Sequence, residues 1–341
     1  MAARIALGLV DDLSGLLTTL LNGSHSVVAG RLAGAFRALG RTAYADSIVN
    51  TMKSADYVVI ENSPFDVAPP ALPGGRPESP HAQRLRATWE RMRGVVIANL
   101  PAPKPLPADI SGTLRDVEAR YISDAYHSLS IEGYRVTPEL IERVRSGTWD
   151  PDGRDRDARD AMAAKGYFEA HTEVTAFIES ALKSPAPTHT LQDALSSWCR
   201  ALFSPSVQIA LLKPSDLAGR RNDQVHIRGA MHVPLSTEAV RDCMPVLFDL
   251  ISAEPNAGVR GVLGHFFLVY IHPYMDGNGR LGRLLMNAML VTGGYVWTVV
   301  PVDRRKHYME ALEKASTTQE IAMFSAFIGQ LIREQTDAPL N

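Results

Sequence analysis

The chain of 341 residues is long enough for one large domain or two modest ones. Its 35 lysines and arginines against 37 aspartates and glutamates leave a formal net charge of −2, which argues against a protein held on nucleic acid or a membrane by bulk charge alone. A hydrophobic fraction of 45% beside 21% charged residues excludes a globally disordered chain and predicts a buried core.

The sequence shows neither a disulfide framework nor a membrane span. Its two cysteines, Cys199 and Cys243, have no neighbouring Cys or His at metal-ligand spacing. The first apolar stretch, Ile5–Leu21, contains two aspartates and lacks the small-residue cleavage site of a secretory signal. No other run approaches the roughly 18 uninterrupted apolar residues of a spanning helix. We therefore expect a soluble, cytoplasmic protein without a membrane partner.

Residues 1–65 form the first predicted unit, which is small and helical. Apolar residues at helical spacing predict helices that end near Asn22 and Gly40, followed by a third helix over 42–54 and a strand over Tyr57–Ile60. This order is typical of a helix-turn-helix or winged-helix unit, so DNA is one candidate partner. A helical docking module explains the same pattern equally well, and the sequence leaves both hypotheses open.

Residues 66–109 are predicted to be a proline-rich linker with one helix. Prolines dominate 67–80 and 101–107, where they fix φ and remove backbone donors. We expect an exposed linker in the first stretch and a stiff extended connector in the second. The residues between them, 81–100, have the pattern of a single helix.

From residue 110 to residue 335 the pattern is almost entirely helical. The expected helices span 110–131, 138–146, 156–183, 190–202, 237–253, 257–271, 280–293 and 305–335. The exception is Gln224, Val225, His226 and Ile227, where apolar and polar residues alternate before a glycine, which predicts a short strand or hairpin. The expected fold class is mainly α with a small β-hairpin flap.

The densest cluster of chemically active residues is IHPYMDGNGRLGR at 271–283, a polar loop between two apolar helices. Gly277 and Gly279 let the backbone approach a ligand, and N–H groups at the start of the following helix favour phosphate. Arg280 and Arg283 lie three apart on that helix and face the same way, so both can grip phosphate oxygens bidentately.

Two further side chains of this loop complete the chemistry. Asp276 supplies a hard oxygen ligand of the kind that Mg²⁺ prefers. His272 is the nearby group that can take a proton near neutral pH. Each residue alone is ordinary, and the combination is what predicts a phosphate-handling site.

The segment HPYMDGNGRLGR resembles the signature of the Fic (filamentation induced by cAMP) family, HPFx(D/E)GNGRxxR, with Tyr274 in place of phenylalanine. The resemblance covers roughly residues 110–335 and is supported by His265 upstream and Tyr308 downstream. Many relatives have a second tyrosine where this chain has Met309. The related Doc kinases have lysine in place of Gly279, so the glycine favours nucleotidyl transfer.

The resemblance implies a protein adenylyltransferase, in which a Ser, Thr or Tyr hydroxyl of a target protein attacks the α-phosphate of ATP and pyrophosphate leaves. It implies that His272 is the general base, that Asp276 holds Mg²⁺ and that Tyr308 contributes to the nucleotide site. The implied phosphate ligands are Gly277, Asn278 and Gly279 as the anion hole, with Asn278 on the α-phosphate, Arg280 on the β-phosphate and Arg283 on the γ-phosphate.

The family places a target-docking flap where this chain has residues 224–227. A target segment could add there as an extra strand and align its hydroxyl through main-chain hydrogen bonds. A hairpin that only covers the core is the alternative interpretation.

Ser128, Glu132 and Gly133 belong to the stretch SLSIEG, which resembles the family's inhibitory motif (S/T)xxxE(G/N). Residues four apart share one helix face, and a glycine suits a helix C-terminus. The resemblance implies an inhibitory helix over about 114–133, whose Glu132 pairs with Arg283 and keeps it from the γ-phosphate. A surface carboxylate at a helix end, or a residue that orients water for removal of AMP, are the other interpretations.

The leading hypothesis is therefore a self-inhibited AMP-transferase that uses ATP and Mg²⁺ and modifies a target protein or itself. The alternatives are a de-AMPylase or another nucleotidyl transferase on the same fold, and a DNA-binding regulator that acts through residues 1–65. A homodimer is expected by resemblance to other Fic proteins.

Overall fold

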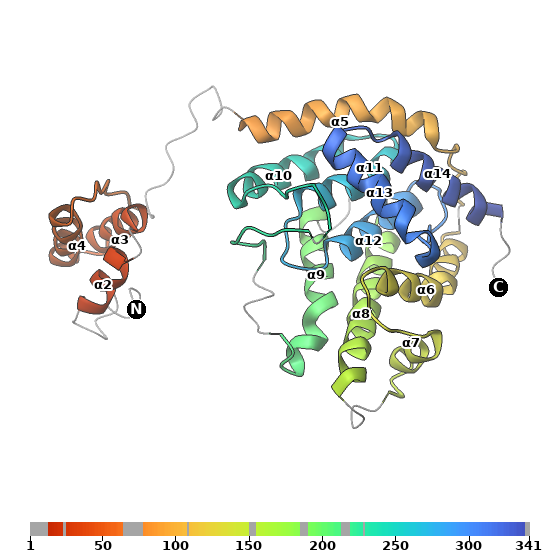
Figure 1. Ribbon diagram of the computed structural model, residues 1–341, viewed down its shortest axis with the longest axis horizontal. Coiled ribbons are helices and arrows are strands. Elements are labelled where there is room, and N and C mark those ends of the chain that lie inside the picture. Colours follow the sequence, from red (N-terminus) through yellow and green to blue (C-terminus); the bar gives the residue numbers. More distant parts are fainter. Residues whose placement is uncertain are drawn as a thin grey trace. The chain divides into compact units, whose positions relative to one another are not determined.

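The computed structural model describes residues 13–22, 25–63, 78–107, 109–149, 155–184, 190–212, 219–227 and 229–337. The chain divides into two compact units, Met1–Glu78 and Ser79–Asn341, and each has its own hydrophobic core. Helices make up most of the described residues of both units (Figure 1), and none of the described residues forms a β-strand. The prediction of a mainly α fold is confirmed. Within the described ranges, no helix is both long and apolar enough to cross a membrane.

The described part of the smaller unit contains α2 (Ser14–Asn22), α3 (Ser26–Ala38) and α4 (Thr42–Ser54) around a shared core. The strand expected over Tyr57–Ile60 is not formed, and that prediction was wrong. The segment instead runs over α3 at Gly30, where a side chain would collide with the Ile60 carbonyl, and the Asn62 N–H donates to the Gly30 carbonyl at 3.2 Å. A lone segment laid on a helix has no neighbouring strand with which to exchange ladder bonds.

The proline-rich stretches lie on either side of α5 (Pro80–Asn99), which belongs to the larger unit. Most of the expected linker at 67–80 lies outside the described residues. Ser79 caps α5 by accepting the Ala82 N–H at 3.3 Å. Trp89 then stacks on Phe267 of the core with 5.8 Å between ring centroids, so the helix is anchored by burial of a large aromatic side chain.

In its described residues the larger unit continues with nine further helices, which carry the core and the site. Their bounds are α6 (Ser111–Ile131), α7 (Pro138–Arg145), α8 (Asp155–Lys183), α9 (Leu191–Gln208), α10 (Thr237–Ala253), α11 (Ala257–Ile271), α12 (Asn278–Val291), α13 (Arg305–Thr318) and α14 (Ala322–Asp337). A short 3₁₀ turn at Val302–Arg304 leads into α13.

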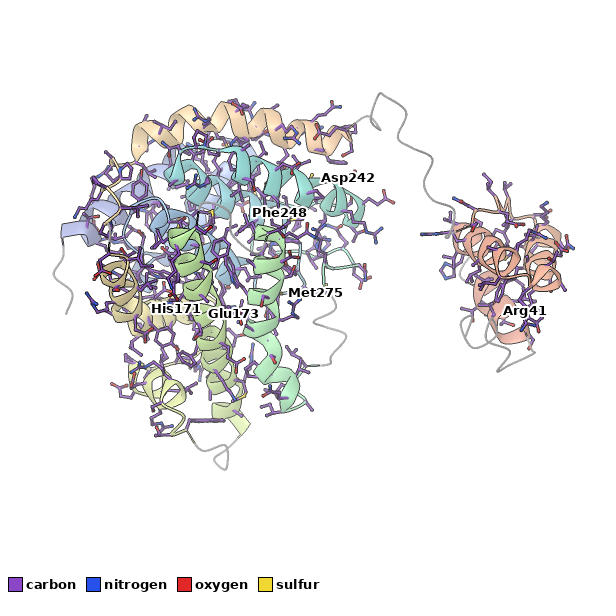
Figure 2. All side chains as sticks on the ribbon, turned by 180° about the vertical axis from the view of Figure 1, so that it is seen from behind. Arg41, His171, Glu173, Asp242, Phe248 and Met275 are labelled. Carbon is purple, nitrogen blue, oxygen red and sulfur yellow. The ribbon has the colours of Figure 1, made fainter. Side chains whose placement is uncertain are left out.

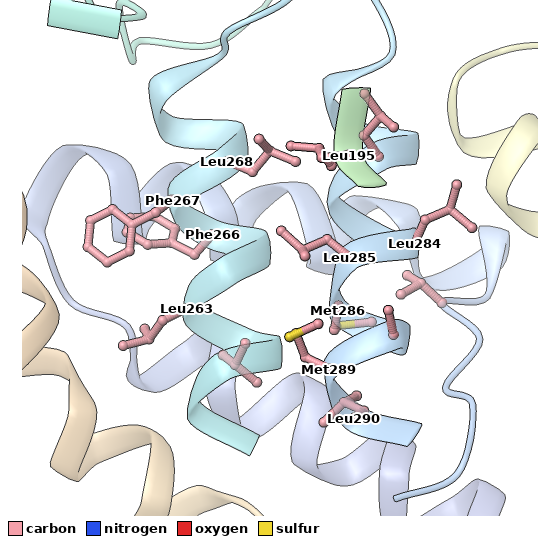
Figure 3. Packing of buried hydrophobic residues seen from close by; sticks show 14 of the residues in the cluster. Leu195, Leu263, Phe266, Phe267, Leu268, Leu284, Leu285, Met286, Met289 and Leu290 are labelled. Atoms are coloured by element: carbon pink, nitrogen blue, oxygen red, sulfur yellow. The ribbon is translucent and has the colours of Figure 1, made fainter. Parts of the chain in front are cut away.

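Helices α11 and α12 lie side by side at the centre of this unit (Figure 3). Leucine and methionine side chains, among them Leu268, Leu285 and Met289, pack between the two helices, and Gly261 lets Leu290 approach so closely that a Cβ would lie 3.0 Å from its Cγ. Every residue of α12 except Gly279 is buried. The central helix therefore meets the surroundings only at its N-terminal end.

One predicted helix is broken in the structure. The helix expected over 305–335 splits into α13 and α14 at Gln319, whose φ is 60°. No glycine or proline marks the break in the sequence. The side chain of Arg91 on α5 donates to the Gln319 amide oxygen, and the Gln319 N–H donates to the Ala315 carbonyl at 3.0 Å. A contact between distant segments thus accompanies the left-handed residue.

The predicted flap is a loop rather than a β-hairpin, and the strand expected at 224–227 is not formed. The chain does turn back here, because the Ala230 N–H donates to the Ile227 carbonyl at 3.1 Å and Gly229 has a φ of 78°. A side chain occupies a carbonyl that strand pairing would otherwise use, since Gln224 Nε2 donates to the Pro234 carbonyl at 2.9 Å. Pro234 has no N–H to return.

Candidate active site

His272 lies at the junction between α11 and the loop that precedes α12. It caps α11 in the left-handed conformation (φ 55°, ψ 60°), and its N–H donates to the Leu268 carbonyl at 2.9 Å. Its Nδ1 lies 3.3 Å from the Val269 carbonyl. Because a carbonyl can only accept, Nδ1 carries the proton in this contact, which leaves Nε2 as the basic nitrogen. Burial lowers the pKa of His272, with a further lowering from Arg221, so the ring is neutral at neutral pH.

The N-terminus of α12, six residues further on, forms a cradle whose geometry suits an anion. Gly277 is the N-cap, with a φ of 82°, and a Cβ there would lie 2.8 Å from the Phe203 ring. The first intrahelical bond of α12 runs from the Leu281 N–H to the Gly277 carbonyl at 2.9 Å. The N–H groups of the first turn therefore point out of the helix end, where the helix dipole favours negative charge.

Asn278 shapes the loop with its side chain. Its Oδ1 accepts the Tyr274 N–H at 3.0 Å and its Nδ2 donates to the Tyr274 carbonyl at 2.9 Å, and the residue is buried. The expected contact of Asn278 with an α-phosphate would therefore rest mainly on its backbone N–H. The aromatic anchor Tyr274 is buried beneath the loop, while Met275, labelled in Figure 2, is exposed.

Arg280 is buried between two aromatic rings. Its guanidinium lies 5.3 Å from the centroid of Tyr134 and 5.1 Å from that of Phe203, and it donates to Asp276 Oδ2 at 3.0 Å. Cation–π contacts of this kind hold an arginine in place without neutralising it. Sequence reasoning missed Tyr134 and Phe203, because neither belongs to the motif that carries Arg280.

Arg283 is buried one turn further along α12. Its Nε donates to Ser128 Oγ at 2.9 Å, and its Nη2 donates to the Ser128 carbonyl at 3.0 Å and to Glu132 Oε1 at 2.7 Å. Burial by itself lowers the pKa of Arg283, but Tyr308 and Glu132 outweigh burial and raise it above its usual range. The structure thus brings Ser128, Glu132 and Arg283 together from helices far apart in sequence.

Glu132 lies directly over the cradle. Its Oε1 would be 2.5 Å from a Cβ placed on Gly279, so only glycine leaves room for this carboxylate. The side chain of Glu132 is 28% exposed, against 2% for Arg283. Two interactions attract a carboxylate to this place: the hydrogen bond from the Arg283 guanidinium and the positive N-terminal end of the α12 dipole. Gly133 has a φ of 88° and ends the turn that follows α6.

Tyr308 supports Arg283 from behind. Arg283 Nη1 donates to the Tyr308 hydroxyl at 3.4 Å, and this hydroxyl lies 2.8 Å from His265 Nε2. Burial lowers the pKa of His265 to about 3, so its ring is neutral. Its Nε2 can then accept a hydrogen bond from the Tyr308 hydroxyl. Because Tyr308 is fully buried, its place in the structure is that of a support for the arginine.

Asp276 is the carboxylate best placed for a metal ion. It is exposed, accepts the Gly277 N–H at 2.6 Å and pairs with Arg280. Over the described part of the chain, no group of three or more His, Cys, Asp or Glu side chains forms a metal site. Mg²⁺ takes one or two carboxylates together with substrate phosphates and water, so this donor set fits a magnesium ion that arrives with a nucleotide.

Two separate comparisons, one with family models and one with curated proteins, find similarity to Fic proteins. The family model described as Fic/DOC matches residues 206–290, which contain the cradle and both arginines. A relative named Protein adenylyltransferase Fic from Nematostella vectensis is 28% identical over 69% of this chain and 52% of its own length. One of the same name from Drosophila willistoni is 28% identical over 67% of this chain and 43% of its own length. The chain thus spans about half the length of these curated relatives.

Solved structures share the fold. Fic-1 (residues 134–508) from C. elegans aligns with a TM-score of 0.55 at 17% identity, covering 98% of this chain and 93% of its own. A Fic domain containing signalling protein from Bacteroides thetaiotaomicron aligns with a TM-score of 0.53 at 18% identity, covering 75% of this chain and 95% of its own. At these identities the likeness concerns the fold alone.

Proposed function

We propose that residues 206–290, which match the Fic/DOC family model, form a Fic domain, and that the protein is an adenylyltransferase that moves AMP from ATP to a hydroxyl of a protein and is held inactive by Glu132. The observation that carries the proposal is the placement of one neutral, basic imidazole and an anion-binding helix end on a single short loop. Transfer of a nucleotidyl group needs positioning and charge neutralisation more than covalent chemistry.

In this mechanism the phosphates of ATP lie at the start of α12. The N–H groups of residues 278–280 donate to phosphate oxygens, and Arg280 and Arg283 neutralise the β- and γ-phosphates. A Mg²⁺ ion bound with the nucleotide would neutralise further phosphate charge, with Asp276 as its protein ligand. The two arginines are already immobilised by their neighbours, so little conformational freedom is lost on binding.

His272 activates the acceptor. Its Nε2 takes the proton of the incoming Ser, Thr or Tyr hydroxyl, the hydroxyl oxygen forms a bond to the α-phosphorus, and the bond from that phosphorus to the bridging oxygen breaks, so that pyrophosphate leaves. The loop that contains Gln224, Val225, His226 and Ile227 is the proposed docking segment for the target. It is tied to the His272 carbonyl through Arg221, which places it beside the base.

Glu132 is the proposed brake. Its carboxylate holds Arg283 Nη2 and lies against Gly279, where it competes with a phosphate oxygen for the same guanidinium and the same helix end. ATP then binds weakly, or with its γ-phosphate displaced from Arg283.

The test is incubation of the wild type, His272→Ala and Glu132→Gly with Mg²⁺ and ATP labelled at the α-phosphate. We expect label on protein to rise in Glu132→Gly relative to the wild type. The label should be absent from the double variant that carries both Glu132→Gly and His272→Ala. His81→Ala, which removes an exposed histidine of α5, is the matched control and keeps the activity of its parent. Absence of label in Glu132→Gly, with ATP binding intact, would refute the proposal.

The position of Glu132 also supports a second activity. A carboxylate at the phosphate cradle can orient a water molecule toward the phosphorus of a modified target, which would remove AMP. Incubation of AMP-modified protein with the wild type and with Glu132→Gln distinguishes the two, because only a hydrolytic carboxylate makes release of AMP depend on Glu132.

The DNA-binding alternative has less support. Arg37, one of the basic residues of the smaller unit, donates to Asp46 at 2.8 Å and also pairs with Glu61, so its charge is already balanced. The pKa of Glu61 is lowered by this hydrogen bond to Arg37.

A further inference from the structure

Arg221 is a buried arginine that bonds to main-chain carbonyls. It is 3% exposed, and its guanidinium donates to the His272 carbonyl at 2.7 Å, to the Asp223 carbonyl at 2.9 Å and to the Leu235 carbonyl. Its own N–H donates to the Pro273 carbonyl at 2.8 Å. Burial lowers the pKa of Arg221. Among the described residues no carboxylate pairs with Arg221, and a buried charge of this kind is costly, so these bonds indicate a defined structural task.

The bonds of Arg221 join two separate parts of the site. The proposed docking segment spans residues 222–235, with Asp223 and Leu235 at its two ends, and His272 and Pro273 begin the catalytic loop. One planar guanidinium therefore holds three carbonyls in a fixed geometry, whereas the three donors of a lysine lie on one small ammonium group at the end of a flexible stem. The left-handed backbone of His272 is held by the same contact.

The tip of the segment, at Met231 and His232, is anchored separately. Glu313 of α13 accepts the Met231 N–H at 2.7 Å and the His232 N–H at 3.1 Å. His232 Nε2 lies 2.9 Å from the Tyr270 carbonyl, and its ring stacks on Tyr270 with 4.6 Å between centroids. While α11 and α13 hold the tip, Arg221 holds the two ends of the segment beside the catalytic loop.

We propose that Arg221 is a positioning residue that sets the distance and register between the docking segment 222–235 and His272. The inference rests on the proposed function, because the register matters only if a hydroxyl docked on the segment must reach His272 Nε2. A base must lie within hydrogen-bonding reach of the proton that it takes, and a misplacement of about 1 Å costs roughly 100-fold in rate.

The experiment uses the full chain carrying Glu132→Gly as the parent. Arg221→Ala and Arg221→Lys are added to it, and Arg241→Ala, an exposed arginine of α10, is the matched control. Three quantities are measured: amide hydrogen exchange, the affinity for MgATP, and the division of the α-phosphate label between protein and free AMP released to water.

We expect Arg221→Ala to speed exchange in 222–235 by at least about ten-fold while α12 stays protected, because bonds of the loop are lost and the core is not. Label on protein should fall by at least about ten-fold relative to AMP released to water, with MgATP affinity unchanged, because water needs no docking segment. Arg221→Lys should lie between Arg221→Ala and the parent, and Arg241→Ala should match the parent.

Unchanged exchange in the loop, or an unchanged division of label, would overturn the inference. Faster exchange throughout α12 together with lost ATP binding would also overturn it, since that pattern marks a general structural role. A parent without any label would instead refute the proposed function, and this is recognised before an Arg221 variant is compared with it.

Discussion

Glu132 and Gly279 are in contact: the carboxylate oxygen that bonds to Arg283 at 2.7 Å would lie 2.5 Å from a Cβ on Gly279. The glycine at the open end of α12 is thus needed in two ways. It exposes the helix N-terminus to phosphate, and it makes room for the carboxylate that occupies the same place. Substrate and brake are expected to exclude one another at this point.

Glu132→Gln should increase transfer of AMP and tighten binding of MgATP. The amide keeps the shape of the side chain but removes the charge that holds Arg283. Removal of one partner from a fully buried ion pair costs about 3–5 kcal/mol. Because Glu132 is partly exposed, we expect the interaction that MgATP must displace to be about 1–2 kcal/mol, so its loss should tighten MgATP binding roughly 5- to 30-fold. Calorimetric titration with MgATP measures it.

Glu118→Gln is the control for this prediction, because Glu118 is an exposed carboxylate of the same helix that pairs with Arg145 at the surface. It should leave affinity and transfer at the wild-type level. If Glu132→Gln and the wild type bind MgATP with equal affinity, Glu132 is not a brake on nucleotide binding.

Gly279→Ala should destabilise the wild type more than it destabilises a chain that lacks the Glu132 side chain. In the wild type the new methyl group collides with the carboxylate, whereas Glu132→Gly removes that neighbour. We expect an interaction energy of about 0.5–3 kcal/mol in a double-mutant cycle of unfolding free energies. Additive effects of the two substitutions would show that the contact does not determine stability.

Tyr134→Ala should weaken MgATP binding by loosening Arg280. Removal of one ring from the pair around the guanidinium forfeits a cation–π contact of about 0.5–2 kcal/mol, or roughly 2- to 30-fold in affinity. The affinity is measured in the Glu132→Gly background, so that the brake does not obscure it. Tyr134→Phe keeps the ring and should bind as its parent does. A loss of equal size in both variants would assign the effect to the hydroxyl.

The acidic limb of the pH–rate profile should lie below the usual histidine range. Burial lowers the pKa of His272 from 6.5, and the base works only when it is unprotonated. The value of kcat/KM for Glu132→Gly is therefore expected to be constant around neutral pH and to fall only as the pH drops through this lowered pKa. A limb centred above 6.5 would show that another group, or a protonated His272, controls the rate.

His265 should make folding stability depend on pH. Its folded pKa of about 3 lies below the ordinary 6.5, so the unfolded chain binds the extra proton between these values, and stability is lost as the pH falls from 6.5 toward 3. The contribution is at most about 1.4 kcal/mol per pH unit.

Comparison with His265→Asn isolates this contribution, because buried Asp124, whose pKa is raised to about 6, acts in the opposite sense in both proteins. We expect the unfolding free energy of the variant, measured by denaturant titration between pH 5 and 6, to fall less steeply with acid. Equal slopes would contradict a neutral, buried His265.

The sequence was informative where function depends on neighbours in the chain. The loop from His272 to Arg283 joins two apolar helices, so its spacing alone predicts that base, cradle and arginines lie together. The contacts of Arg280 with Tyr134 and Phe203 could not be predicted in this way, because each ring comes from a different helix or loop and is placed by tertiary packing.

The errors have related causes. Alternation over 224–227 predicted a strand, but a strand exists only when a neighbour supplies a ladder, and here Gln224 and Arg221 take carbonyls of the loop instead. Arg221 itself gave no signal, since a single arginine in an irregular segment is usually solvated. The break at Gln319 depends on a partner from α5, which local propensity cannot show.

The near-complete burial of α12 has a consequence for how this protein tolerates change. Arg280 and Arg283 are among the largest fully buried side chains of the chain, so the groups proposed to read the nucleotide are also packing elements of the core. Substitution of either arginine would therefore lower the amount of folded protein in the cell as well as its activity, because the arginine also packs in the core. A nucleotide bound to them would act in the reverse direction, because it would stabilise the folded chain against degradation by RT ln(1 + L/Kd), where L is the concentration of free nucleotide.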